Sequence, residues 1–75
     1  MDGRTVSIDG AKVRELRLAA LLSQRMLSRV VRVTPETINK IERGKRPCIY
    51  LLTLHALAQA LNVEPRALLR SDGDG

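Results

Sequence analysis

Positive charge gathers in one stretch of this sequence, residues 24–46. Seven basic and two acidic residues lie there and give +5, which equals the net charge of the whole 75-residue chain. The remaining residues carry six basic and six acidic groups and sum to zero. Guanidinium and ammonium groups grouped in this way can bind a polyanion, although a solvated basic face is the alternative reading. The seven basic residues are Arg25, Arg29, Arg32, Lys40, Arg43, Lys45 and Arg46.

Residues suited to other kinds of chemistry are few. The single cysteine, Cys48, cannot form an intrachain disulfide, and we expect it to act as a loop hydrophobe rather than a redox switch. The single histidine, His55, has no cluster of Cys or His beside it, so we expect no metal and no cofactor. The sequence also lacks a Gly-rich phosphate loop, and we therefore expect that the protein is not an enzyme.

The sequence carries no sign of a membrane segment. Its start, "MDGRTVSIDG", has no apolar signal-peptide core. Nowhere does it reach the run of roughly 18 apolar residues that a membrane helix needs. These features predict a cytoplasmic protein that does not contact a membrane.

Composition predicts one all-α domain. Apolar residues make up 44% of the chain and are nearly all Leu, Val, Ala and Ile, with Tyr50 as the one aromatic residue. A β-sandwich without aromatic residues would be unusual, whereas a Leu/Ala-rich helical bundle is expected. We divide the chain into a disordered N-terminal segment at 1–6, a folded domain at 7–70 and an acidic flexible tail at 71–75.

Capping signals place the helices. Ser7 or Asp9 can cap the first helix, and Ser23 can cap the second. The strongest start is "TPE" at 34–36, which combines a cap, a first-turn proline and a carboxylate near the positive end of the helix dipole. Gly44 is typical of a residue that follows a helix end, and "KRPCI" then reads as a loop. We expect five short helices, at about 9–21, 24–31, 35–43, 51–61 and 65–69.

The second and third of these helices are separated by about three residues, Val31–Val33. Two helices joined so tightly cross steeply, which is the helix-turn-helix arrangement. The second helix of such a pair protrudes, and its outer face would carry Pro35, Glu36, Asn39 and Lys40. The major groove of B-DNA admits an α-helix of this kind.

At these residues the sequence resembles the phage-repressor/Cro-type helix-turn-helix family, often called the Xre family. The resemblance covers about residues 10–69 and rests on "GAKVRELR", "SQRMLSRVVRVTPETINKIERGKRP" and "TLHALAQALNVEPRALL". The matching elements, in order, are Leu16-Arg17, Ser23-Gln24, Val33, Ile38, Ile41-Glu42, Gly44 and Leu57-Ala58-Gln59-Ala60-Leu61.

The resemblance implies a compact five-helix, lambda-repressor-like DNA-binding domain that inserts its third helix in the major groove. It implies a sequence-specific double-stranded DNA-binding transcription regulator, most simply a repressor of a Cro-like or antitoxin-like kind. Residues expected to contact bases are Pro35, Glu36, Asn39 and Lys40. Residues expected to contact phosphates are Gln24, Thr34, Arg43, Lys45 and Arg46. Arg17 and Glu42 are expected to form an ion pair that fixes the pose of the third helix.

The sequence departs from the family pattern at three positions. Leu21 stands where a glycine usually ends the first helix, and Ser28 stands where a small Ala is usual. Arg32 occupies the turn position usually held by Gly, where φ is often positive and a side chain costs about 1 kcal/mol or more.

Apolar residues remain that one small core cannot easily cover. We expect a dimer interface from Tyr50, Leu52, Leu68 and Leu69, in a homodimer on an inverted-repeat operator. The alternative is a protein-interaction module of the same fold that binds a partner protein through the fourth and fifth helices. Non-specific nucleic-acid binding is a further alternative.

Overall fold

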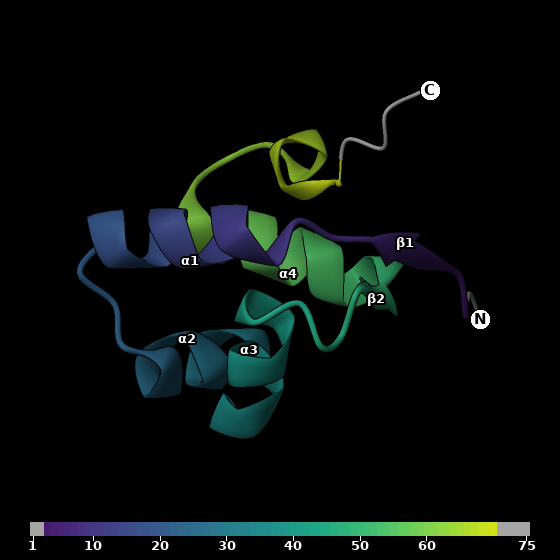
Figure 1. Ribbon diagram of the computed structural model, residues 1–75. Coiled ribbons are helices and arrows are strands. Elements are labelled where there is room, and N and C mark those ends of the chain that lie inside the picture. Colours follow the sequence, from purple (N-terminus) through teal and green to yellow (C-terminus); the bar gives the residue numbers. More distant parts are fainter. Residues whose placement is uncertain (1–2, 71–75) are drawn as a thin grey trace.

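The computed structural model describes residues 3–70 and contains both helices and a small sheet (Figure 1). The fold is mostly helical, as expected, but the expected count of five helices is wrong and the sheet was not expected. Four α-helices are present in the described residues, together with one short 3-10 helix and two strands. In chain order the elements are β1 (Thr5–Ser7), α1 (Gly10–Ala19), α2 (Gln24–Val31), α3 (Pro35–Glu42), β2 (Cys48–Tyr50), α4 (Leu51–Leu61) and the 3-10 helix η1 (Pro65–Leu68).

Side-chain caps start the first three helices as expected. The carboxylate of Asp9 accepts a hydrogen bond from the backbone N–H of Lys12 at 3.1 Å. Ser23 Oγ accepts from the N–H of Met26 at 3.0 Å, and Thr34 caps α3 with Pro35 as its first residue. Each cap satisfies an N–H that has no partner inside its helix, so these sequence signals were sufficient to locate the starts.

The sheet lies where disorder and a loop were expected. β1 and β2 pair antiparallel, with Thr5 opposite Tyr50 and Ser7 opposite Cys48. Between them Val6 faces Ile49, which is buried. The expected disorder of residues 1–6 is thus wrong for Thr5 and Val6. Pairing between segments more than 40 residues apart is a tertiary event, and three-residue strands give almost no local pattern.

The last element is a 3-10 helix and not the fifth α-helix that we expected. It begins at Pro65 and ends at Leu68, after which Leu69 forms an isolated β-bridge with Ile8. The N–H of Arg70 also donates to the carbonyl of Ser7 at 3.1 Å. Backbone pairing with the segment after β1 ends the helical turn early. The expected tail at 71–75 lies outside the described residues.

Apolar side chains from every helix meet in one core. α4 supplies Leu54, Leu57, Ala58 and Leu61, and it packs against α2, η1 and both strands. In Figure 1, α2 and α3 form a pair below α1 and α4. The side chains from the other elements that complete the core are Ile8, Val13, Leu27, Val31, Ile38, Ile41, Ile49 and Leu68.

One glycine is required by the packing of α1 against α3. A Cβ on Gly10 would overlap the carbonyl oxygen of Ile41, near the end of α3. The first residue of α1 therefore approaches the α3 backbone more closely than any side chain allows. This contact brings the start of α1 to the end of the helix that carries the candidate site.

Candidate nucleic-acid interface

The turn between α2 and α3 has the geometry that its sequence position predicted. Arg32 ends α2 in the left-handed region, with φ 67° and ψ 44°. The N–H groups of Arg32 and Val33 both donate to the carbonyl of Ser28, at 2.7 and 3.0 Å. Thr34 then returns to extended backbone and caps α3. The chain thus turns sharply within three residues, and α3 follows α2 without a longer loop.

The base-contact candidates lie on the outer face of α3. Pro35, Glu36 and Lys40 are exposed and Asn39 is half-buried. Lys40 Nζ lies 4.0 Å from a carboxylate oxygen of Glu36, and both side chains are largely exposed to solvent. An exposed pair at this distance is weak, so either side chain can leave it for another partner. The face therefore presents a carboxylate, an ammonium and an amide together.

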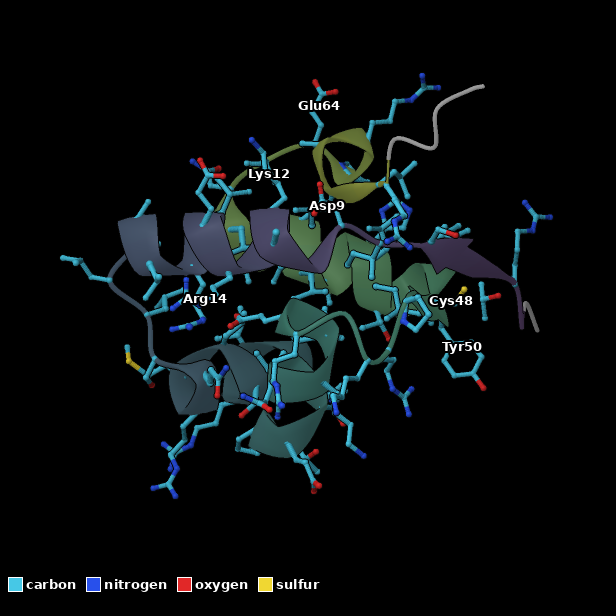
Figure 2. The ribbon with its side chains drawn as sticks, in the orientation of Figure 1. Asp9, Lys12, Arg14, Cys48, Tyr50 and Glu64 are labelled. Atoms are coloured by element: carbon cyan, nitrogen blue, oxygen red, sulfur yellow. The ribbon has the colours of Figure 1, made fainter. Side chains whose placement is uncertain are left out.

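Basic side chains surround this face. Arg43, Lys45 and Arg46 are exposed directly after α3, and Gly44 makes the turn between them with φ 78°. The N–H groups of Lys45 and Arg46 donate to the carbonyl of Lys40, which folds the basic loop back against the helix end. Figure 2 shows nitrogen-bearing side chains extending from α2 and α3 on the side away from α1. The further exposed basic residues of that side are Arg25, Arg29 and Arg32.

The Thr34 hydroxyl combines capping with exposure. Thr34 Oγ1 accepts from the N–H of Thr37 at 3.1 Å and lies 2.9 Å from the hydroxyl of Thr37. A hydroxyl has one donor and two acceptor positions. If the Thr37 hydroxyl donates to Thr34 Oγ1, Thr34 accepts twice and its own proton is available for a partner outside the protein. The role of Thr37 was not predicted, and its signal in the sequence was its place three residues after the cap.

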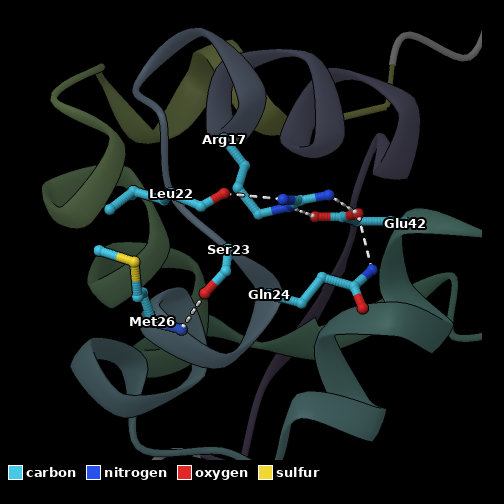
Figure 3. Close-up of polar contacts among 6 residues, drawn as sticks. All are labelled: Arg17, Leu22, Ser23, Gln24, Met26 and Glu42. Atoms are coloured by element: carbon cyan, nitrogen blue, oxygen red, sulfur yellow. Dashed lines mark hydrogen bonds and ion pairs between the residues drawn. The ribbon is translucent and has the colours of Figure 1, made fainter.

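A buried ion pair joins α1 to the end of α3, as predicted. Arg17 Nε donates to Glu42 Oε2 at 2.6 Å, and Arg17 Nη2 donates to Glu42 Oε1 at 3.1 Å (Figure 3). The two side chains are only 9% and 1% exposed. Arg17 Nη1 also donates to the carbonyl of Leu22, at 2.8 Å, in the connection between α1 and α2. The guanidinium therefore ties three segments together, and the Leu22 contact had no signal in the sequence.

Gln24, a predicted phosphate contact, is half-buried at the start of α2. Its Nε2 donates to Glu42 Oε1 at 3.1 Å (Figure 3). The side chain is thus connected to the ion pair and is not an isolated surface amide.

The predicted dimer residues have very different surroundings. Tyr50 is 58% exposed and Leu52 is 79% exposed, whereas Leu69 is half-buried. Figure 2 shows Tyr50 extending away from the body of the molecule. Leu68 has no exposed surface at all, so its assignment to a dimer interface is wrong. Leu68 packs in the core because η1 lies against α4.

The remaining chemistry-bearing residues stand apart from this face. Cys48 is exposed in β2, so the expectation of a loop hydrophobe is wrong, and His55 is exposed on α4. Among residues 3–70 no group of three or more His, Cys, Asp or Glu is placed to hold a metal ion. No helix in the same range is long and apolar enough to cross a membrane.

The solved structures that resemble this fold include several regulators. The restriction-modification controller protein C.AhdI from Aeromonas hydrophila is 38% identical, with a TM-score of 0.72 over 77% of this chain and 86% of that one. The P22 c2 repressor, solved in complex with a synthetic operator, is 30% identical, with a TM-score of 0.77 over 84% of this chain and 94% of that one. The clp gene regulator ClgR from Corynebacterium glutamicum is 26% identical, with a TM-score of 0.71 over 76% of this chain and 60% of that one.

The search of curated proteins gave no match to this sequence. A family model described as "Helix-turn-helix" matches residues 13–68, which include α2, the turn, α3 and α4. The match covers more than half of the sequence and agrees with the geometry of the α2–α3 turn. The chain therefore belongs to this helix-turn-helix family.

Proposed function

We propose that this protein is a sequence-specific double-stranded DNA-binding transcription regulator that places α3 in the major groove. The observation that carries the proposal is the exposed, mixed polar face of α3, which has basic side chains on its flanks and a buried ion pair behind it. The similarity to an operator-bound repressor supports the same reading. Repression of a Cro-like or antitoxin-like kind is the simplest form of this function.

Each candidate base contact has a chemical partner in the groove. Lys40 can donate to guanine O6 and N7, and the Asn39 amide can pair with adenine N6 and N7. Glu36 can accept from cytosine N4, which gives a carboxylate beside phosphates a favourable contact. Pro35 offers an apolar surface that suits a thymine methyl.

The phosphate contacts set affinity and orientation. Arg43, Lys45 and Arg46 are exposed and lie next to the recognition face, so they can reach the backbone without leaving the protein surface. Gln24 is the first residue of α2 and Thr34 caps α3, and the N–H groups at these helix starts favour an anion. Contacts by charged side chains make the affinity fall with salt, and they carry no sequence information.

We further propose a homodimer on an inverted-repeat operator, with Tyr50 and Leu52 at the interface and Leu69 beside them. Tyr50 and Leu52 are among the most exposed large apolar side chains of the described residues. In such dimers two recognition helices lie about 34–36 Å apart, one turn of DNA. Leu52→Glu should shift the protein towards monomer in sedimentation. An unchanged mass would remove Leu52 from the interface.

A protein-interaction module of the same fold is the second candidate. A hollow of about 450 Å³ lies between α2 and α4, where Val30 and Leu52 are both exposed. Exposed apolar side chains at the rim of a hollow can receive a partner protein. If Leu52→Glu leaves the mass and the DNA affinity unchanged, this second function becomes the better account of that surface.

The experiment that tests the proposed function is a selection from a random duplex library at roughly physiological salt. Enrichment of a palindrome is the expected result. On the enriched duplex, Lys40→Ala should relax preference at a base position by about 1–3 kcal/mol. The matched control Lys45→Ala should weaken all duplexes about equally. Equal effects of both changes on selected and random DNA would show that α3 does not read bases.

A further inference from the structure

The side-chain amide of Gln24 has one orientation available to it beside Glu42. Its Nε2 lies 3.1 Å from Glu42 Oε1, and a carboxylate can only accept hydrogen bonds. The amide must therefore turn its NH2 group, and not its oxygen, towards Glu42. Figure 3 shows the Gln24 oxygen directed away from that carboxylate.

The Glu42 carboxylate is held in place independently of Gln24. Its side chain is 1% exposed, and both of its oxygens accept from Arg17. Arg17 in turn is held by the carbonyl of Leu22 at 2.8 Å. The acceptor that faces Gln24 thus has a fixed position relative to α1, to the α1–α2 connection and to the end of α3.

The same NH2 group has a second proton that this contact does not use. Phosphate oxygens are acceptors, so they bind an N–H and repel the amide oxygen. At the start of α2 the backbone N–H groups favour the same ligand.

We propose that Glu42 is a positioning residue for phosphate binding: it holds the Gln24 amide with the NH2 group available to the DNA backbone. This inference rests on the proposed DNA binding. It assigns to the buried ion pair a role beyond stability, because the network sets the phosphate contact of α2 relative to the base-reading face of α3. Arg17 already supplies the positive charge that pairs with Glu42, and the neutral Gln24 amide adds only a hydrogen bond.

The experiment uses the ¹⁵N-labelled protein and a random-sequence duplex at low salt, because a phosphate contact does not depend on sequence. In the free protein, one of the two Gln24 side-chain amide protons should be shifted downfield by Glu42. On addition of the duplex, the other proton should shift. Gln59, which is exposed on α4, is the internal reference and should show neither effect.

Three variants complete the test. Gln24→Met keeps the side-chain length and should weaken duplex binding about tenfold, with the salt dependence unchanged because no charge is removed. Gln59→Met should bind like the unchanged protein. Glu42→Gln should abolish the downfield signal of the Gln24 amide. If Glu42→Gln does not fold, Gln24→Met still tests the contact between Gln24 and the duplex.

The outcomes separate the two proposals. If the unchanged protein retains no duplex, the proposed DNA-binding function fails, and the positioning role fails with it. If the duplex is bound but Gln24→Met binds equally well, only the positioning role is overturned. A Gln24 side-chain amide whose two proton shifts in the free protein match those of the exposed Gln59 would also overturn it, because Glu42 would then not hold the amide.

Discussion

Replacement of Arg17 by Met tests whether the buried ion pair is responsible for holding α3. The change leaves the Glu42 carboxylate, whose side chain is 1% exposed, with the Gln24 amide as its remaining hydrogen-bond donor among residues 3–70. Breaking a buried pair by removal of one partner costs about 3–5 kcal/mol. Loss of the hydrogen bond to the Leu22 carbonyl adds about 1 kcal/mol.

This cost is large for a domain of 75 residues. At about 0.05–0.15 kcal/mol per residue, the whole free energy of unfolding is about 4–11 kcal/mol. Arg17→Met should therefore remove about half of the stability or more and lower Tm by about 15–50 °C. Urea unfolding followed by circular dichroism measures the change directly.

The double variant Arg17→Met with Glu42→Met separates the charge from the packing. Apolar side chains of similar volume in place of a buried pair often restore stability, so the double variant should be markedly more stable than Arg17→Met alone. The matched control is the exposed pair of Lys40 and Glu36, at 4.0 Å, where Glu36→Ala should change stability by less than about 1 kcal/mol. A cost below about 1 kcal/mol for Arg17→Met would refute the reasoning, because the carboxylate would then find water or another partner.

Three further predictions concern packing and backbone, each checked by thermal or urea unfolding. Leu68→Ala should cost about 2–5 kcal/mol because the side chain is fully buried, whereas Leu52→Ala should change stability little; similar costs would show that η1 does not pack as described. Gly10→Ala should destabilise strongly because a Cβ meets the α3 backbone, while Gly3→Ala, in open space, should not. Leu21→Gly should stabilise by roughly 0.5–1 kcal/mol because Leu21 has φ 60°; a loss would show that the turn is not left-handed there.

Local signals explain why much of the candidate site could be predicted. Ser23 and Thr34 cap helices with their own side chains, and Gly44 takes a positive φ that suits glycine. These preferences act over three or four residues, so the sequence alone placed α2, α3 and the turn between them. The concentration of charge in residues 24–46 is likewise a property of the sequence itself.

Contacts between distant segments could not be predicted from local sequence signals. β1 pairs with β2, and Ile8 bridges to Leu69, through backbone N–H and C=O groups. Because nearly every residue carries these groups, no residue type predicts the pairing. Leu68 and Leu69 are identical in type, yet one is buried and the other half-exposed. That difference depends on how η1 meets α4, which is decided by packing of the whole core.

The sequence by itself determined the helix-turn-helix, its basic surroundings and the pairing partners Arg17 and Glu42, because caps, charges and a family motif are local or compositional. Only the tertiary structure decided that Gln24 joins this pair, that Leu22 accepts from it, and that Leu68 belongs to the core. These facts follow from the positions of side chains brought together across the fold. The physical reason is that a buried carboxylate needs hydrogen-bond donors and a small core needs close-packed apolar side chains. Which residues meet these needs depends on the neighbours that the completed fold brings together.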